Sequence, residues 1–223
     1  MMNILDVKNL TVDYGKHPVL SDFSLSVTQG EAVLIKGPSG CGKSTLLHAI
    51  CGLIPSIIDA RISGDVILFG KQTTELTVAE RAEIVGIVFQ NPETQMFCDT
   101  VEDEIAFGLE NICMPTEDIA RRIDEVLALV KMEDFRYASP KELSGGQKQR
   151  VVLAAVLALN PKILLLDEAL SQLDSSGKQT MLTHLETLKN QGHTMLMVDH
   201  DDILAQIADR IIDFEDYVVK TIK

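Results

Sequence analysis

The spacing of hydrophobic and polar residues changes along the chain from a strand-like to a helix-like pattern. Short apolar runs, separated by glycine and proline, predict strands in the first ninety residues. The predicted strands are Ile4–Val12, Phe23–Val27, Glu31–Ile35 and a further pair at Asp65–Phe69 and Ile84–Phe89. A helix is predicted to begin at a glycine-rich turn and to run through Ser44–Cys51.

The middle of the chain has the helical period. Thr116 is a suitable N-cap, and an apolar stripe of helical spacing follows it at Ile119, Ile123, Val126, Leu127 and Val130. From Gly145 onward helices alternate with strands, which are predicted at Ile163–Asp167, Thr194–Asp199 and Arg210–Phe214. The helix between the first two covers about 176–190, and another follows the second strand. This alternation indicates an α/β fold with a mostly parallel sheet covered on both faces, into which a helical subdomain at about 91–160 is inserted.

Composition narrows the class of protein. The chain has 223 residues, 46% hydrophobic and 24% charged, with a net charge of −13, so it suits one globular domain. The acidic net charge argues against nucleic acid as a principal partner, because phosphate binding needs clustered Lys and Arg. No apolar run reaches 18 residues, and the N-terminus lacks the features of a signal peptide. Four cysteines without a CxxC pair favour a reduced, cytosolic setting.

A glycine-rich segment follows the third predicted strand and fits the pattern G-x-x-x-x-G-K-[ST]. It reads Gly37-Pro38-Ser39-Gly40-Cys41-Gly42-Lys43-Ser44, with Thr45 next. Glycines let backbone N–H groups turn toward phosphate oxygens, and the helix N-terminus adds positive potential. In this pattern Lys43 reaches the β- and γ-phosphates and the Ser44 hydroxyl binds Mg²⁺. The sequence therefore predicts an ATP site formed by Gly37, Ser39, Gly40, Cys41, Gly42, Lys43, Ser44 and Thr45.

Two carboxylates end the apolar strand at Ile163–Asp167 and its next residue. A buried parallel strand delivers such side chains to the sheet edge where phosphates bind. Asp167 is expected to hold Mg²⁺, and Glu168 to act as general base on the attacking water. His200 closes the following strand and is expected to contact the γ-phosphate, although a histidine at a strand end also has a purely structural interpretation.

A second glycine-headed helix start lies at Leu143-Ser144-Gly145-Gly146-Gln147. Two phosphate-binding helix starts are too many for one triphosphate, so the second is expected to serve a nucleotide held by another molecule. The alternative is a flexible N-cap.

Taken together, these motifs resemble the ATP-binding cassette (ABC) family of P-loop ATPases across nearly the whole chain. The resemblance implies a RecA-like core at about 1–90 and 161–223, with an antiparallel N-terminal β part and the inserted signature subdomain at about 91–160. It also assigns Gln90 to the Q-loop, as a catalytic and Mg²⁺-binding residue, Tyr14 to adenine stacking and Asp174 to the D-loop. It implies a dimer with each ATP between one chain's Lys43 and the other's signature. One departure is Ala169-Leu170, where the family usually has Pro-Thr.

The segment Gln90–Asn111 is similar to the ATPases of energy-coupling factor (ECF) importers, including the cobalt and nickel relatives. That resemblance implies ATP-driven uptake of a vitamin or transition-metal ion, with a membrane coupling subunit and a substrate-binding membrane subunit as partners. It also implies a peripheral location on the cytoplasmic face of the membrane. An apolar surface with an acidic rim is expected to receive the coupling subunit, or else this segment packs on its own domain. Its apolar members are Met96, Phe97, Ile105, Ala106, Phe107 and Leu109, and its rim is Glu102, Asp103 and Glu104. The alternatives are another ABC importer or exporter, or a soluble ABC ATPase.

Overall fold

A computed structural model describes residues 3–15, 18–200 and 202–214 of the chain. Nine strands are formed in these residues, and they divide between two sheets. The strands are β1 (Asn3–Asp13), β2 (Pro18–Thr28), β3 (Ala32–Lys36), β4 (Arg61–Leu68), β5 (Lys71–Gln72), β6 (Val85–Val88), β7 (Ile163–Asp167), β8 (Thr194–Asp199) and β9 (Arg210–Asp213).

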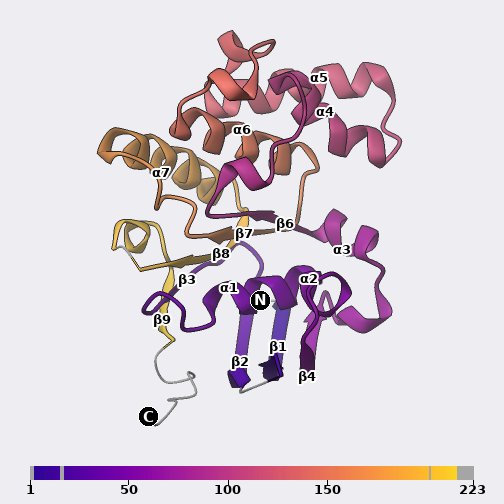
Figure 1. Cartoon of the computed structure of the whole chain (residues 1–223), viewed down its shortest axis with the longest axis vertical. Coiled ribbons are helices and arrows are strands. Elements are labelled where there is room, and N and C mark those ends of the chain that lie inside the picture. Colours follow the sequence, from indigo (N-terminus) through magenta and orange to yellow (C-terminus); the bar gives the residue numbers. More distant parts are fainter. Residues whose placement is uncertain (1–2, 16–17, 201, 215–223) are drawn as a thin grey trace.

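Helices connect the strands and form a layer of their own. The α-helices are α1 (Lys43–Cys51), α2 (Leu53–Ser56), α3 (Val78–Ile84), α4 (Val101–Asn111), α5 (Thr116–Val130), α6 (Gly145–Ala158) and α7 (Ser175–Asn190). Single 3₁₀ turns lie at Thr73–Glu75, Pro92–Thr94, Glu133–Phe135, Pro140–Glu142 and Ile203–Gln206. Figure 1 shows α4, α5 and α6 together at one end of the molecule and β1, β2 and β4 at the other.

The larger sheet is parallel throughout, in the order β6-β7-β8-β3-β9. Successive side chains of a strand point to opposite faces of the sheet. In the three central strands, β7, β8 and β3, the side chains on both faces are buried. On β7, Leu164 and Leu166 join the apolar cluster that includes α4, α5, α6 and α7. Ile163 and Leu165 join the second cluster, with α1 and the smaller sheet. The predicted parallel sheet with two covered faces is therefore confirmed.

The smaller sheet is antiparallel, in the order β2-β1-β4-β5. It confirms the antiparallel N-terminal β part, but it corrects one expected pairing. The predicted strands at Asp65–Phe69 and Ile84–Phe89 do form, as β4 and β6, yet they lie in different sheets: β4 pairs with β1, and β6 pairs with β7. Periodicity identifies a strand without identifying its neighbour, and α3 leads the chain from one sheet to the other between these two strands.

Two further local expectations need correction. The predicted helix after β8 is only a 3₁₀ turn at Ile203–Gln206. Leu204 and Ile207, three positions apart, are both buried, so the apolar spacing of a helix is present but only one short turn forms. Helix α5 begins at Thr116 itself, with Pro115 in the capping position and no side-chain cap. Pro115 suits that place because its fixed φ, here −58°, is already close to helical and no N–H is needed there.

In the described residues, no helix combines the length and apolar character needed to span a bilayer.

Candidate nucleotide site

Four chain segments with predicted chemistry leave the parallel sheet at the same edge. The glycine-rich loop follows β3, Phe89 and Gln90 follow β6, Glu168 follows β7, and His200 follows β8. Parallel strands place their carboxyl ends together, and this edge is where open α/β sheets bind ligands. The topology therefore brings together residues that lie as far as 163 positions apart in the sequence.

The loop between β3 and α1 has the backbone conformation that its glycines permit. Gly40 and Gly42 have φ of 79° and 103°, in the left-handed region that other residues rarely adopt. A Cβ on Gly42 would lie 2.9 Å from the carbonyl oxygen of Val19, so the β2 backbone also approaches too closely for any side chain. Ser39 and Gly40 are exposed, whereas Cys41 is 6% exposed. The loop is thus a fixed, open turn at the N-terminus of α1.

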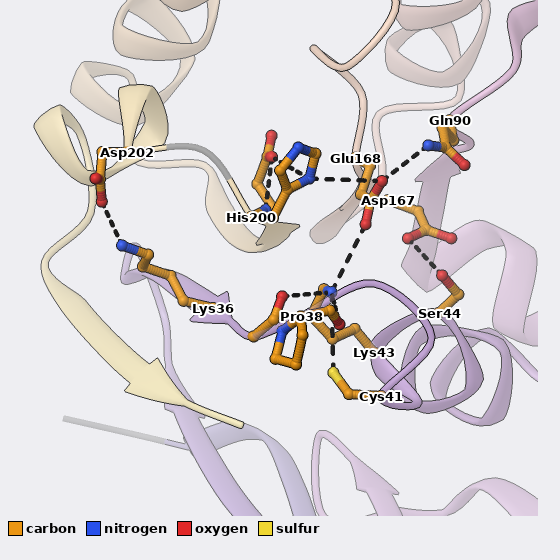
Figure 2. Close-up of polar contacts among 12 residues, drawn as sticks. Lys36, Pro38, Cys41, Lys43, Ser44, Gln90, Asp167, Glu168, His200 and Asp202 are labelled. Atoms are coloured by element: carbon orange, nitrogen blue, oxygen red, sulfur yellow. Dashed lines mark hydrogen bonds and ion pairs between the residues drawn. The ribbon is translucent and has the colours of Figure 1, made fainter. Parts of the chain in front are cut away.

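Lys43 lies underneath this loop and is 3% exposed. Its ammonium donates hydrogen bonds to the carbonyls of Gly37 (2.8 Å) and Pro38 (2.9 Å), and it lies 3.6 Å from Glu168 Oε1. A buried ammonium needs such partners because removing a charge from water is costly. Lys43 therefore brings a positive charge to the inner side of the loop and close to the carboxylate that follows β7 (Figure 2).

Ser44 and Asp167 form the part of the site that suits a divalent cation. The Ser44 hydroxyl donates a hydrogen bond of 2.8 Å to Asp167 Oδ1, and Asp167 is 5% exposed. Burial raises the pKa of the Asp167 carboxyl, and the hydrogen bond from Ser44 opposes that shift. A cation would further favour the ionised carboxylate. Hydroxyl and carboxylate oxygens are hard ligands of the kind Mg²⁺ prefers, and Mg²⁺ commonly completes its shell with water and phosphate oxygens.

The Glu168 carboxylate is the point where three other segments meet, as Figure 2 shows. Gln90 Nε2 donates a hydrogen bond of 2.8 Å to Glu168 Oε2, and His200 Nδ1 lies 3.8 Å from the same oxygen. Lys43 approaches the other oxygen. Glu168 has φ of 45°, and its N–H donates to the carbonyl of Val198. The arrangement can hold a carboxylate in one orientation at the edge of the phosphate loop.

Tyr14 lies beside this site and directly follows the last residue of β1. Its side chain is 42% exposed, and its hydroxyl lies 3.4 Å from the Thr45 hydroxyl, either of which can be the donor. The ring is thus accessible next to the first turn of α1, as a base-stacking residue has to be. Stacking on adenine stays a prediction.

The second glycine-headed helix start has no part in these contacts. Ser144 and Gln147 form a capping box: the Gln147 N–H donates to Ser144 Oγ (3.3 Å) and the Ser144 N–H donates to Gln147 Oε1 (2.8 Å). Asp174 caps α7 through the Gly177 N–H. The starts of α6 and α7 line one hollow of about 380 Å³, and no residue of the Gly37–Thr45 loop contributes to it. Its lining residues are Ser144, Gly145, Gly146, Gln147, Arg150, Gln172, Asp174, Ser176, Gly177 and Thr180. Leu143, the first signature residue, is 6% exposed and belongs to the core.

The family model described as "ABC transporter" matches residues 20–171, which include the phosphate loop, the signature and the carboxylate pair. This chain belongs to the ABC transporter family. Among its relatives is the energy-coupling factor transporter ATP-binding protein EcfA1 of Leuconostoc mesenteroides, 40% identical over 97% of this chain and 79% of the relative. EcfA1 of Streptococcus thermophilus is also 40% identical, over 98% of this chain and 79% of the relative. The chain is accordingly an ATP-binding, ATP-hydrolysing cassette of a transporter.

Solved ABC structures have the same fold. The cbiO1 protein of Clostridium perfringens, described as part of the ABC transporter complex cbiONQ, is 31% identical and aligns with a TM-score of 0.85 over 96% of this chain and 85% of its own. The dimeric bacterial ABC transporter cassette MJ0796 is 31% identical, with a TM-score of 0.80 over 94% of this chain and 93% of its own. The predicted P-loop ABC ATPase fold is therefore confirmed.

Sequence reasoning missed Gln149, a buried polar residue next to the Q-loop. Gln149 is 1% exposed, and its amide donates a hydrogen bond of 3.2 Å to the carbonyl of Phe89, the residue before Gln90. The run Gln147–Arg150 reads as a uniformly polar helix start. However, Gln149 lies two and three positions before Val151 and Val152, both buried on the inner side of the same helix. The closeness of Gln149 to this apolar face is the sequence signal that could have indicated its burial.

The expected apolar surface of the Q-loop segment is smaller than the sequence suggested. Ile105 and Leu109 are fully buried in the core, and Glu104 is 6% exposed, so these three do not belong to it. The helical period of α4 turns them inward, as the alternative interpretation required. Phe97 (65% exposed) and Phe107 (45% exposed) do face outward, and their rings meet edge to face with centroids 4.7 Å apart. We refer to Phe97 and Phe107 as the aromatic pair.

Proposed function

We propose that this cassette is the ATPase subunit of an importer of the ECF type, which takes up a vitamin or a transition-metal ion. The relatives named EcfA1, 40% identical along almost the whole chain, support this choice over other transporter classes. In this proposal the cassette is a peripheral protein on the cytoplasmic face of the membrane, bound to an integral coupling subunit and, through it, to a substrate-binding subunit.

A second ABC cassette, either an identical copy or a related chain, is the other proposed partner. The observation that carries this proposal is the separation of the signature from the phosphate loop: the signature hollow is lined by α6, α7 and the D-loop alone. Ser144, Gly145 and Gly146 are therefore separate from the contacts made by Lys43 and Ser44. In the dimer they enclose the ATP held by the partner, and closure around ATP drives uptake. We further propose that residues 91–160 act as a subdomain that moves with this closure.

Within one cassette, the loop Gly37–Thr45 binds the triphosphate. Its backbone N–H groups and the start of α1 supply positive potential, and Lys43 exchanges its carbonyl contacts for the β- and γ-phosphate oxygens. Ser44 and Asp167, with Gln90 at the rim, hold Mg²⁺, which supplies charge neutralisation at those phosphates. Tyr14 stacks on the adenine, a contact worth about 1–3 kcal/mol where bases stack on aromatic side chains.

Glu168 is the proposed general base. It accepts a proton from the water whose oxygen bonds to the γ-phosphorus, while the bond from that phosphorus to the bridging oxygen breaks and ADP leaves with the electron pair. Gln90 and Lys43 fix the orientation of the carboxylate, so it is aligned before the water arrives. His200, 53% exposed beside Glu168, contacts the γ-phosphate and helps to organise the transition state.

The variant Glu168→Gln tests both the base and the dimer. The neutral amide cannot accept the proton, so turnover should fall by at least about 100-fold, while ATP affinity is kept. The trapped ATP-bound dimer should appear in light scattering of the purified protein with Mg-ATP. Glu186→Gln, an exposed change on α7, is the matched control and should leave turnover unchanged. Unaltered turnover in Glu168→Gln rejects the base; a monomer at saturating Mg-ATP, with no second cassette restoring association, rejects the dimer.

The aromatic pair is the proposed contact with the membrane coupling subunit. Exposed aromatic rings anchor protein interfaces. Met96, the residue before Phe97, lines a hollow of about 270 Å³. Phe97→Asp should therefore abolish co-purification of an integral membrane subunit from detergent extracts. Ile57→Asp, an equally drastic change at an exposed apolar residue (69%) after α2, should not. Loss with both variants, or with neither, argues against this surface. Recovery with ribosomes or nucleic acid instead favours a soluble ABC ATPase.

A further inference from the structure

Phe89, the residue that separates β6 from Gln90, is held on three sides. Its N–H donates a hydrogen bond of 2.7 Å to Gln95 Oε1, and its carbonyl accepts one of 3.2 Å from Gln149 Nε2. Its ring meets the imidazole of His48 nearly edge on, with centroids 5.7 Å apart and planes at 77°. This is the favourable geometry for two aromatic rings. Backbone and side chain of Phe89 are thus both fixed.

Two of these three contacts come from helices that begin at the nucleotide motifs. His48 lies on α1 four positions after Ser44, hence on the same helix face, one turn further from the phosphate loop. Gln149 lies on α6 five positions after Ser144. The third partner, Gln95, belongs to the Q-loop itself and also donates to the carbonyl of Ile87. Phe89 is therefore the point where the phosphate-loop helix, the signature helix and the Q-loop meet.

The environment of Gln149 shows that its contact is a specific one. The side chain is 1% exposed, and a buried amide with no hydrogen bond costs about 1–3 kcal/mol. An apolar residue would fill the same space without that cost, so packing alone does not account for a glutamine there. What the amide adds is a donor for the Phe89 carbonyl, which fixes the position of the main chain one residue before Gln90.

Gln90 depends on this support. It is exposed, and its amide reaches the Glu168 carboxylate from the end of a strand of only four residues. A shift of the preceding peptide moves the amide directly, and misplacement by about 1 Å can cost about 100-fold in rate. We propose that His48 and Gln149 are positioning residues which hold Phe89, and through it Gln90, in place against Glu168. This inference rests on the proposed roles of Gln90 and Glu168.

Variants of similar volume remove each contact. His48→Leu removes the ring–ring contact, and Gln149→Met removes the donor. Each should lower kcat for ATP hydrolysis by the purified cassette about tenfold and leave KM for ATP within about twofold, because the phosphate loop is untouched. His48→Phe keeps an aromatic ring against Phe89 and should retain kcat within about twofold. Unfolding midpoints of the variants separate these effects from a loss of folded protein.

The same changes in a Gln90→Ala background decide whether the effect passes through Gln90. Residues that act through one another are not additive, so His48→Leu and Gln149→Met should then lower kcat less than twofold further. A tenfold loss in both backgrounds overturns the inference, and so does an unchanged kcat in the wild-type background. If Gln90→Ala lowers kcat and the two helix variants do not, the inference fails while the proposed function stands. If Glu168→Gln leaves turnover unchanged, the proposed function fails first.

Discussion

Glu104 provides a test of how the Q-loop segment is held in place. It lies on α4 with 6% of its surface exposed, and its Oε2 accepts hydrogen bonds of 2.9 Å from the N–H groups of both Phe97 and Cys98. One carboxylate oxygen thus binds two successive peptide groups at the base of the aromatic pair. Glu104→Ala removes this shared acceptor and leaves the N–H groups of Phe97 and Cys98 without their partner.

The expected loss of stability follows from the number and kind of the hydrogen bonds that Glu104 accepts. Hydrogen bonds to a charged group contribute about 1.5–3 kcal/mol each, and water can reach the exposed side of this loop and recover part of the loss. We expect Glu104→Ala to lower the free energy of unfolding by about 3 kcal/mol. Glu104→Gln keeps an acceptor oxygen of the same reach but removes the charge, which roughly halves the strength of such bonds. Its expected cost is about 1 kcal/mol.

Urea unfolding followed by circular dichroism measures these differences as shifts of the midpoint at constant slope. The matched control is Glu110→Ala, which removes an exposed carboxylate from the last turn of the same helix. Cys98 gives a local readout: burial foremost, then Glu104, raises the pKa of its thiol to about 11. In Glu104→Ala, alkylation of Cys98, located by mass spectrometry, should accelerate at pH 8. A stability loss no larger than that of Glu110→Ala, with alkylation unchanged, refutes this account of the loop.

Three further outcomes follow from the structure. Lys43→Ala should weaken ATP binding about 100-fold in calorimetry, because a buried charge that meets the phosphates is lost; a dissociation constant within threefold of the wild type contradicts this. Gly42→Ala should cost about 1–3 kcal/mol of stability, since φ is 103° and the new Cβ meets the β2 backbone; an unchanged urea midpoint contradicts it. Burial, with two nearby cations, lowers the pKa of His184 below that of an unfolded-chain histidine, so the unfolded state binds more protons as pH falls below about 6.5. Stability should therefore fall from pH 7 to pH 5.5, more steeply than in His184→Gln, and equal slopes would argue against the buried neutral histidine.

The predictions that succeeded depended on local signals with a strong physical basis. The strand at Ile163–Asp167 is a continuous apolar run that ends in an acid, a pattern typical of a strand buried on both faces. The helix at Lys43 follows glycines whose left-handed conformations the motif requires. In both cases the chemistry of a few adjacent residues decides the structure, so the sequence alone contains the information.

The predictions that failed concerned relations between distant segments. The residues 61–68 and 85–88 both have strand character, yet whether they pair depends on the path of the chain through α3. Likewise, four apolar residues of α4 were candidates for an exposed surface: Ile105, Ala106, Phe107 and Leu109. Only the packing of α4 against α5 and α6 determines that Ile105 and Leu109 are buried and Phe107 is not. Gln149 was missed for the same reason, because its partner is a carbonyl sixty positions away.

Ala169 and Leu170, which stand where the family usually has Pro-Thr, support the turn at Glu168 by apolar packing. Glu168 adopts φ of 45°, a conformation that costs an ordinary residue about 1–2 kcal/mol. The next two residues, 4% and 0% exposed, belong to the apolar cluster of α6 and α7, and burying one leucine side chain contributes about 1.5–3 kcal/mol. Burial of Leu170 alone is therefore sufficient to offset the strain that turns the Glu168 carboxylate toward Lys43 and Gln90. The orientation of the proposed base in this cassette is thus coupled to apolar contacts behind it, at positions where the family usually has Pro and the polar Thr.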